Sequence, residues 1–385
     1  MRIAISGASG YIGQHLSSFL EGKGYDVIPL GRDLFKEDCF DELCRCVESC
    51  EVVINLAGAS INKRWTEAYK QELYDSRICV TRQLVHAINT RSVKLELFIS
   101  ASAVGYYPAF GEYDEYHDCR GMDFLARLCG AWEEEASACS SDVRLVITRF
   151  GVVLSEDGGA LKEMLRLQRF SRVSVVIGNG QQRFPWISLF DLCRSFGYII
   201  RNRQMRGVVN LVSPDLITQK QLAHTLARAD KIRRIIPLPE FFFRLKFGEG
   251  ASFVTKGQTV HPSKLQESGF TYIYPTIEKL MNITDHHTVP ELDVKRYMGR
   301  WYEIARYENH FERGMTDVTA TYTLLPDGKI RVENEGYKGG VHKKATGRAK
   351  QPDPKNNPGK LKVAFFLWFY ADYYILELDA DYQYA

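Results

Sequence analysis

The second half of the chain lacks cysteine. All nine cysteines of this 385-residue protein lie between Cys39 and Cys193. The one cluster among them, Cys39, Cys44, Cys46 and Cys50, has neither the spacing of a zinc knuckle nor a CxxC redox pair. Free thiols on a helix are therefore favoured over a metal site, and no metal is expected. An odd number of cysteines without a spacing framework indicates a reducing compartment.

The sequence also lacks a long apolar run and a leader. No stretch of about 18 apolar residues occurs, so no membrane span is expected. The first six residues, Met1-Arg-Ile-Ala-Ile-Ser, run directly into a strand pattern, without the charged segment, long apolar stretch and cleavage site of a signal peptide. The cytoplasm is therefore the expected compartment.

An excess of charge of one sign is missing as well. The chain has 50 lysines and arginines against 47 aspartates and glutamates, and the net charge of +3 gives no argument for a nucleic-acid partner. Hydrophobic residues make up 45% of the chain and charged residues 25%, as in ordinary globular proteins. Because 385 residues are too many for one comfortable core, we expect two or three domains.

Apolar strand patterns alternate with helical periodicity through the first part of the chain. Strands are expected at residues 2–6, 25–30, 51–57, 94–100 and 143–149, and helices at residues 11–24, 66–89 and 123–138. This alternation predicts an α/β fold with a doubly wound parallel sheet that is covered on both faces. Further helices at residues 160–169, 189–201 and 218–228 predict a small lobe that carries substrate contacts.

The composition changes near residue 285. A polar segment with a proline, residues 285–290, is expected to be a linker. Beyond it, strands are expected at residues 300–307, 317–325, 329–337, 343–350, 360–366 and 373–378, with the start of a seventh at 381–385. Many short strands at regular spacing predict an antiparallel barrel or sandwich. The expected domains are residues 1–235, a small C-terminal subdomain at 236–284, the linker, and residues 291–385.

Three glycines follow the first strand, in the order Gly7-Ala-Ser-Gly-Tyr-Ile-Gly13. Such a loop between a strand and a helix predicts a dinucleotide site of the Rossmann type. Gly7 permits the tight turn, Gly10 lets the backbone approach a pyrophosphate, and Gly13 lets the helix pack closely, while the amides at the helix start face negative charge. The expected cofactor contacts in this loop are Gly7, Ser9, Gly10, Tyr11, Ile12 and Gly13. The alternative is a tight turn that binds no ligand.

The end of the second strand indicates which cofactor binds. NAD sites place an acidic residue there for the ribose 2′-hydroxyl, whereas this chain reads Leu30-Gly31-Arg32, and the nearest acid is Asp33. The guanidinium of Arg32 suits a 2′-phosphate, which it can bind with two hydrogen bonds. NADP is therefore favoured over NAD. The alternative is a solvated surface arginine.

Several further motifs carry a family resemblance. They are Asn55-Leu-Ala-Gly-Ala59, Asp75-Ser-Arg-Ile78, Ser100-Ala-Ser-Ala-Val-Gly-Tyr-Tyr107, Arg149-Phe-Gly-Val-Val-Leu154, Asp157-Gly-Gly-Ala160, Trp186-Ile-Ser188, Gly248-Glu-Gly250, Lys264-Leu265 and Gly269-Phe270. With the glycine loop, they resemble the epimerase-type branch of the short-chain dehydrogenase/reductase superfamily over residues 1 to about 283. More narrowly, this segment resembles atypical epimerase family members that carry a small C-terminal domain of unknown function.

The resemblance implies roles for individual residues. The residues expected on the adenine and ribose side of the cofactor are Asn55, Leu56, Ala57 and Gly58. Ser102 falls where the superfamily has its active-site serine, four residues before Tyr106, and would hydrogen-bond the reacting carbonyl oxygen. Arg77 stands roughly where many members have a structural asparagine, and this cation is assigned to the cofactor contacts.

The sequence departs from the superfamily on the next helix. Typical members have Tyr-x-x-x-Lys there, in which the tyrosinate exchanges a proton and the lysine lowers the tyrosine pKa. Neither alignment of this helix provides the pair, since one gives Phe124 with Leu128 and the other Leu125 with Cys129. Carbonyl reduction needs a proton source. The candidates for this proton source, in place of the missing tyrosine, are Tyr106, Tyr107 and Asp123. The alternative is that both tyrosines have only a packing role.

The last segment resembles a second family. Gly299-x-Trp301, the surrounding residues 292–306 and Asp317-Val-Thr-Ala-Thr-Tyr322 are similar to bacterial-type lipocalins from about residue 290 to the end. The resemblance implies an eight-stranded barrel whose closed end is plugged by Trp301 and whose interior binds a fatty acid or lysophospholipid. The candidate wall residues, which could equally be plain core, are Phe365, Phe366, Leu367, Trp368, Phe369 and Tyr370. The strand count is short of a closed barrel, so we expect a truncated barrel or one completed by another chain.

These features lead to three hypotheses. The first is an NADP-dependent oxidoreductase or epimerase that acts on a small carbonyl or hydroxyl substrate, with a tethered lipid-binding domain that raises the local substrate concentration. The second is a non-catalytic NADP-binding sensor or scaffold, because the Tyr-x-x-x-Lys pair is missing. The third is a lipid-binding protein with a regulatory nucleotide-binding domain. The expected partners are a small-molecule substrate, the lipid and a second copy of the chain in a homodimer.

Overall fold

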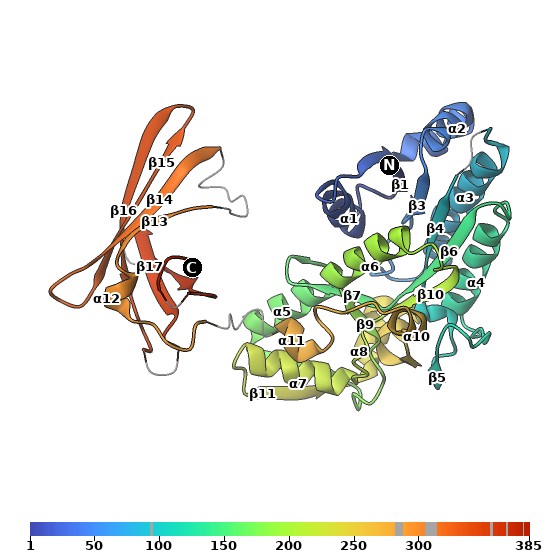
Figure 1. The fold of residues 1–385 in the computed structure, drawn as a ribbon. Helices are drawn as coiled ribbons and strands as arrows, with labels where there is room; N and C mark the ends of the chain where they lie inside the picture. Colours follow the sequence, from blue (N-terminus) through green and yellow to red (C-terminus); the bar gives the residue numbers. More distant parts are fainter. Residues whose placement is uncertain (93–94, 282–287, 305–313, 355–356, 367–368, 380) are drawn as a thin grey trace. The chain divides into compact units, whose positions relative to one another are not determined.

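The computed structural model describes residues 1–92, 95–281, 288–304, 314–354, 357–366, 369–379 and 381–385 (Figure 1). Its contacts divide the chain into unit 1, Met1–Met281, and unit 2, Asn282–Ala385. Each unit has hydrophobic clusters of its own. Half of the expected linker, residues 285–287, lies outside the described residues. None of the helices in the described ranges is both long and apolar enough to cross a membrane.

A six-stranded parallel sheet forms the centre of unit 1 (Figure 1). From one edge to the other, its strands are β2 (Asp26–Leu30), β1 (Arg2–Ser6), β3 (Val52–Asn55), β4 (Leu97–Ala103), β6 (Arg144–Phe150) and β10 (Gly207–Leu211). The order reverses at β1, because the chain adds β2 on one side of it and then crosses to add β3 on the other. In open α/β sheets, ligands bind beyond the carboxyl ends of the strands at such a switch point.

Helices cover both faces of this sheet. On one face lie α1 (Tyr11–Glu21) and α6 (Leu189–Arg201), and on the other α2 (Phe40–Glu48), α3 (Glu67–Thr90) and α4 (Phe124–Ser137). Side chains alternate across each strand, so Ile3 and Ile5 of β1 pack with the first group of helices and Ala4 with the second. Burial on both faces explains why these strands are almost continuously apolar.

A smaller lobe completes unit 1. Its strand pairs are β7 (Val152–Ser155) with β9 (Trp186–Ser188), β8 (Val173–Ile177) with β11 (Arg234–Leu238), and β5 (Glu112–Tyr113) with β12 (Thr259–Val260). Its helices are α5 (Gly159–Ser171), α7 (Gln219–Ala229), α8 (Glu240–Phe247), α9 (Ser252–Thr255), α10 (Ser263–Glu267) and α11 (Ile277–Met281). The amide of Trp65, in the loop after β3, donates to the carbonyl oxygen of Phe247 at 3.2 Å. The end of α8 is therefore tied to a loop at the carboxyl edge of the sheet.

Unit 2 is a curled antiparallel sheet in which each strand pairs with the next (Figure 1). Helix α12 (Val294–Tyr297) precedes β13 (Gly299–Tyr302), β14 (Met315–Leu324), β15 (Ile330–Lys338), β16 (Val341–Lys350), β17 (Lys360–Phe366) and β18 (Phe369–Tyr374). The register of β14 shifts between Thr316 and Thr319, and such bulges bend a strand. Tyr322, Val332 and Leu361 are buried in the core of this sheet.

The fold class predicted from the sequence is confirmed in both units, with a Rossmann-like parallel sheet followed by an antiparallel half-barrel. Two strand predictions near the C-terminal end were wrong. The strand expected at residues 373–378 is β18, which ends at Tyr374 because Tyr374 already pairs with Lys360 at the start of β17. Residues 381–385 form no strand, since the Asp379 carboxylate accepts the amides of Gln383 and Tyr384 at 2.6 Å each and closes a turn.

Candidate nucleotide and catalytic site

The glycine loop lies between β1 and α1, at the switch point of the sheet. Gly7 has a φ of +73°, a conformation that glycine adopts without steric strain. A Cβ at Gly7 would lie 2.8 Å from the carbonyl oxygen of Leu56, and a Cβ at Gly13 would lie 2.2 Å from the carbonyl oxygen of Gly7. The Gly10 amide donates to the same Gly7 oxygen at 2.9 Å and closes the turn. The spacing of the glycines is therefore required by backbone packing.

The start of α1 offers free backbone donors to a ligand. Gly10 is the N-cap and brings no side chain to satisfy the first amides, and the first turn contains no acidic residue. The amides and the helix dipole therefore favour an anion. Ser9 is exposed and Ile12 is half-buried. The ring of Tyr11 packs on Gly158, where a Cβ would lie 2.3 Å from Tyr11 Cε2.

Arg32 is the first residue of a 3-10 helix, Arg32–Phe35, that begins directly after β2. Its side chain is exposed. The neighbouring carboxylate of Asp33 pairs with Lys36 at 2.5 Å, and this contact lowers the pKa of Asp33. The acid that could bind a ribose hydroxyl is therefore engaged, while the cation at the end of β2 is accessible to a ligand.

A buried chain of hydrogen bonds fixes the end of β3. Ser6 of β1 donates to Asn55 Oδ1 at 2.6 Å, and Asn55 Nδ2 donates to Thr81 Oγ1 of α3 at 2.8 Å. Trp132 Nε1 of α4 donates to the same Thr81 oxygen at 2.9 Å. Two strands and two helices are thereby held in one arrangement, and Leu56, Ala57 and Gly58 extend from a rigid base at the edge where a cofactor is expected.

Arg77 of α3 contacts this loop. A Cβ on Gly58 would lie 2.9 Å from Arg77 Cζ, so the guanidinium packs directly against the glycine. It donates to the carbonyl oxygens of Leu73 at 3.1 Å and Ala59 at 3.0 Å, and it lies 5.3 Å from the centre of the Trp132 ring. Burial lowers the pKa of Arg77.

A row of polar side chains crosses the sheet near its carboxyl edge. Ser102 of β4 lies opposite Arg149 of β6, which lies opposite Asn210 of β10. Glu133 of α4 joins this row, since Ser102 Oγ donates to its Oε1 at 2.6 Å and Arg149 donates to both of its oxygens at 2.8 and 2.7 Å. All four residues are buried. Burial lowers the pKa of Arg149, but its contacts with Glu133 outweigh burial and hold that pKa above its ordinary value.

Tyr106 and Tyr107 follow β4 but differ in their surroundings. Tyr107 is 1% exposed, and its hydroxyl lies 2.8 Å from the Asp114 carbonyl oxygen and 3.1 Å from Oδ1 of an asparagine, Asn210. Tyr106 is half-buried, and its hydroxyl donates to an Asp118 carboxylate oxygen at 3.2 Å. Burial raises the pKa of Tyr106. Tyr106 is therefore the less enclosed of the two phenols.

The Arg149 guanidinium lies against both tyrosines, with Cζ 3.5 Å from the centre of the Tyr106 ring and 4.7 Å from that of Tyr107. Its charge lowers the pKa of Tyr106 only in part, since burial has the larger effect. Asp123, the third proton-source candidate, caps α4 by accepting the Ala126 amide at 3.0 Å. The geometry brings Tyr106 together with Arg149 and leaves Asp123 with a structural contact.

Helix α4 has Leu125 and Cys129 at the Tyr-x-x-x-Lys positions in one alignment, and Phe124 and Leu128 in the other. Cys129 is 3% exposed, and burial raises its pKa to about 12. The thiol therefore stays protonated at neutral pH and is no substitute for a lysine. The charge of Glu133 also raises the pKa of Cys129, whereas the charge of Arg77 lowers it.

Comparison with known proteins gives these geometries a context. Residues 3–211 match the NAD dependent epimerase/dehydratase family. The chain belongs to this family. Residues 238–282 match a domain of unknown function, DUF1731, and residues 292–385 match a lipocalin-like domain. Both resemblances expected from the sequence are thereby confirmed.

Relatives of the epimerase-family unit come from plants, bacteria and mammals. The chloroplastic epimerase family protein SDR39U1 homolog of Arabidopsis thaliana is 33% identical over 297 residues, which cover 72% of this chain and 85% of the relative. Epimerase family protein YfhF of Bacillus subtilis is 34% identical over 307 residues, which cover 75% of this chain and 100% of the relative. A crystal structure of human epimerase family protein SDR39U1 with NADPH has a TM-score of 0.68 at 32% identity and covers 74% of this chain and 99% of that one.

The glycine cradle of this epimerase-family unit fits a nicotinamide dinucleotide. A Cβ would fill the cradle at Gly7 and Gly13, and the first amides of α1 are free to bind phosphate. Among the described residues, no group of three or more His, Cys, Asp and Glu side chains could hold a metal ion.

Sequence reasoning did not single out Glu133, Arg149 or Asn210 as site residues. A charge within a strand that is buried on both faces needs a partner, so Arg149 carried a usable signal. Glu133 begins the run Glu133-Glu134-Glu135, in which Glu134 is exposed, Glu135 is half-buried, and each of these two pairs with an arginine. Only its contact with Arg149 in the folded protein distinguishes Glu133 from these two neighbours.

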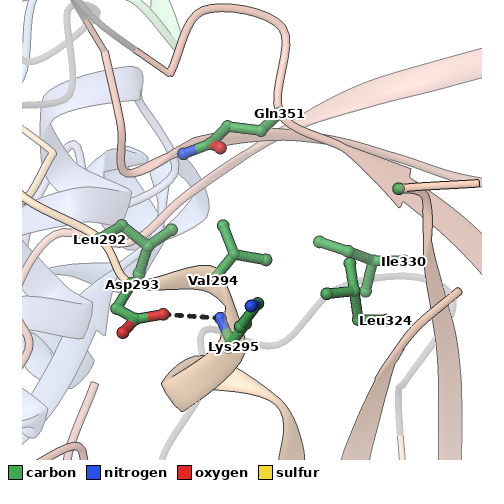
Figure 2. A pocket seen from close by; sticks show the side chains of 8 residues that line it. Leu292, Asp293, Val294, Lys295, Leu324, Ile330 and Gln351 are labelled. Atoms are coloured by element: carbon green, nitrogen blue, oxygen red, sulfur yellow. Dashed lines mark hydrogen bonds between the residues drawn. The ribbon is translucent and has the colours of Figure 1, made fainter. Parts of the chain in front are cut away.

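The lipocalin-like unit has a pocket of about 530 Å³ beside α12 (Figure 2). Its lining residues are Leu292, Asp293, Val294, Lys295, Leu324, Gly328, Ile330 and Gln351. The Asp293 carboxylate accepts the backbone amide of Lys295 at 2.9 Å, the dashed line in Figure 2. Trp301 donates to the Tyr297 carbonyl oxygen at 2.9 Å, and their rings stack with centres 4.8 Å apart. Aliphatic side chains and a lysine thus share one cavity.

Of the six predicted wall residues of the barrel, only Phe365 has a described side chain. Phe365 is 44% exposed and does not line this pocket. Leu367 and Trp368 lie outside the described residues, and the side chains of Phe366, Phe369 and Tyr370 are likewise not described. Their assignment to a ligand-binding wall stays a prediction.

Proposed function

We propose that unit 1 is an NADP-dependent oxidoreductase of the epimerase type that reduces a carbonyl group of a small substrate. The observation that carries the cofactor choice is Arg32, an exposed cation at the end of β2 whose neighbour Asp33 is paired with Lys36. A guanidinium can bind a 2′-phosphate with two hydrogen bonds. The human relative crystallised with NADPH supports the same choice.

In the proposed reaction the protein supplies a proton and holds the groups in place. A reduced nicotinamide, when bound, supplies the hydride that the carbonyl carbon accepts. The phenol of Tyr106 donates its proton to the carbonyl oxygen, which gives the alcohol. Burial raises the pKa of Tyr106, so the phenol is protonated at neutral pH and suits the direction of reduction. The exposed carboxylate of Asp118, which accepts the Tyr106 hydrogen bond, links the phenol to solvent.

Glu133 and Ser102 act as positioning residues in this proposal. Glu133 fixes Arg149 through two hydrogen bonds, and Arg149 lies against the ring of Tyr106. The Ser102 hydroxyl proton is directed at Glu133, so Ser102 orients the carboxylate instead of donating to the substrate. The proposed proton donor, Tyr106, is therefore positioned by packing against Arg149 and not by a lysine.

Replacing Arg32 with alanine tests the cofactor assignment. Hydrogen bonds to a charged group contribute about 1.5–3 kcal/mol, so the dissociation constant of NADPH is expected to rise by about 10- to 100-fold. NADH has no 2′-phosphate and serves as the internal control, with an affinity that stays nearly constant. Fluorescence titration of the full chain with both nucleotides measures the ratio. An equal loss for NADPH and NADH would remove the argument from the 2′-phosphate.

A non-catalytic NADP-binding sensor is the second candidate, and it is favoured because neither alignment of α4 provides the Tyr-x-x-x-Lys pair. The two candidates differ in turnover. We expect the full chain to consume NADPH with at least one member of a panel of aldehydes, ketones and keto sugars, followed by absorbance. Tight binding of NADPH without consumption across the panel would support the sensor instead.

For unit 2, we propose binding of a small amphiphile such as a fatty acid or lysophospholipid. The lipocalin-like match and the cavity with four aliphatic side chains and Lys295 support this role. Tethering such a unit to a reductase would raise the local concentration of an apolar substrate.

A further inference from the structure

Helix α8 of the smaller lobe (Figure 1) is apolar in sequence but is not enclosed by the rest of unit 1. Five of its eight residues are phenylalanine or leucine, and although the whole helix belongs to the described part of the chain, none of its residues is buried. Phe241, Phe242 and Leu245 are 63%, 50% and 63% exposed. A helix this short is marginal in water unless its apolar face packs against something, and contiguous exposed apolar residues mark interaction sites.

The exposed apolar residues of α8 share one side of the helix. Helical spacing places Phe241, Leu245 and Phe242, in that order, within an arc of about 100° around the axis. Arg244 adjoins this arc on one side and Lys246 on the other, and both cations are exposed. Long basic side chains can extend along an apolar surface while the charge stays in a polar layer. An apolar face with cations at both borders is typical of helices that lie in a membrane interface.

The opposite side of α8 fixes the direction of this face. Phe243, Phe247 and Glu240 are half-buried and lie on that side. The Phe247 carbonyl oxygen accepts the Trp65 amide, and a Cβ at Gly178 would lie 3.0 Å from Glu240 Oε1. The helix is therefore attached to unit 1 from behind, and its exposed apolar residues point away from the lobe.

The charge of this segment indicates what covers the face. Residues 231–247, from the start of β11 to the end of α8, contain five lysines and arginines and one glutamate. The cations outside α8, which are all exposed, are Lys231, Arg233 and Arg234. A second copy of the chain, packed about a two-fold axis, would bring the same cations against each other. A surface that is apolar beneath a negative layer complements both the arc and its cations.

We propose that α8 docks unit 1 on the surface of an anionic phospholipid bilayer. Phe241, Phe242 and Leu245 enter the boundary between headgroups and acyl chains, and Arg244 and Lys246 contact the lipid phosphates. This role goes beyond the proposed carbonyl reduction and does not depend on nucleotide binding. Because the end of α8 is tied to the loop after β3, docking holds the carboxyl edge of the sheet near the bilayer, where an apolar substrate would be concentrated.

Co-sedimentation of the full chain with lipid vesicles tests the proposal. We expect binding to vesicles of equal parts phosphatidylcholine and phosphatidylserine, and weaker binding to phosphatidylcholine alone or at high salt. The double variant Phe241→Ser with Leu245→Ser should raise the apparent dissociation constant by at least about 10-fold, because two apolar side chains are lost from the interface. Arg244→Gln with Lys246→Gln should raise it by about 10-fold on the anionic vesicles only. The melting temperatures should stay nearly constant, because all four side chains are exposed.

Phe110→Ser is the matched control, because it removes a phenylalanine that is 71% exposed from the segment before β5, and it should bind vesicles like the unmodified chain. Absence of vesicle binding by the unmodified chain would overturn the proposal. Equal binding by both α8 variants would overturn it too, because it assigns the lipid contact to another surface, such as unit 2. A dimer that the Phe241→Ser and Leu245→Ser variant dissociates, without vesicle binding, would assign the face to a second copy.

Discussion

Replacing Glu133 with glutamine is expected to destabilise unit 1 by about 3–5 kcal/mol. The Glu133 carboxylate accepts two hydrogen bonds from Arg149 and one from Ser102. An amide in its place has one acceptor oxygen and directs its own N–H groups at a cation. The Arg149 side chain is only 4% exposed, so its charge would remain in the interior without a counter-ion. Hydrogen–deuterium exchange of peptides from β4 and β6, in the full chain, measures the loss of stability.

The adjacent residue offers a matched control. Glu134 pairs with Arg120 at 2.8 Å, but 72% of its side chain is exposed, and such surface pairs contribute about 0–1 kcal/mol. Glu134→Gln should therefore change protection little. The double variant Glu133→Leu with Arg149→Met should recover most of the loss, since apolar replacement of a buried pair is often neutral. A Glu133→Gln effect no larger than that of Glu134→Gln would contradict a structural role for the pair.

Much of the sheet could be predicted because its signals are local. β1 (Arg2–Ser6) and α6 (Leu189–Arg201) have the bounds that periodicity indicated. Gly13 was predictable for a local steric reason, since a Cβ there would meet the carbonyl oxygen of Gly7 in the same loop. The place of Arg32 after β2 could be predicted from the strand pattern, and its contact with the cofactor stays a prediction.

Elements that depend on distant partners could not be predicted. The edge strand β10 (Gly207–Leu211), which pairs with β6, was missed, because a short apolar stretch of five residues does not distinguish a loop from a buried strand. At the C-terminal end, the register of β17 with β18, and not the alternation of residues, decides where β18 stops. Local propensity predicts neither the pairing of β10 with β6 nor the end of β18.

The polar row at the carboxyl edge shows the same limit within the site. Glu133 lies one helical turn after Cys129, so periodicity places both on one face of α4. Periodicity does not show, however, that the buried Glu133 carboxylate is compensated by the charge of Arg149. Ser102 was predicted from its position as a substrate contact, yet its hydroxyl is used by Glu133. The contact of Ser102 with Glu133 could not be predicted from the sequence, because it depends on the packing of α4 against β4.

Replacing Tyr106 with phenylalanine is expected to lower kcat for carbonyl reduction by about 10²- to 10⁴-fold, the usual contribution of a general acid. The affinity for NADPH should not change, because the ring that packs against Arg149 is retained. Since burial raises the pKa of Tyr106, its phenol is a donor at every pH below that raised value. The rate of the unmodified enzyme should therefore hold through neutral pH and fall only above about pH 10. Steady-state kinetics and nucleotide titration separate the two effects.

Tyr107→Phe is the control that distinguishes a loss of proton transfer from a general effect of removing a tyrosine hydroxyl. It removes the same atom from the next residue, where the hydroxyl is enclosed between Asp114 and Asn210, so it should lower stability by about 0.5–1.5 kcal/mol and leave kcat close to that of the unmodified chain. A loss of turnover in Tyr107→Phe alone would move the proton donor to the buried ring. Because both variants keep an aromatic ring in place, a difference in kcat between them reports proton transfer and not a change in fold.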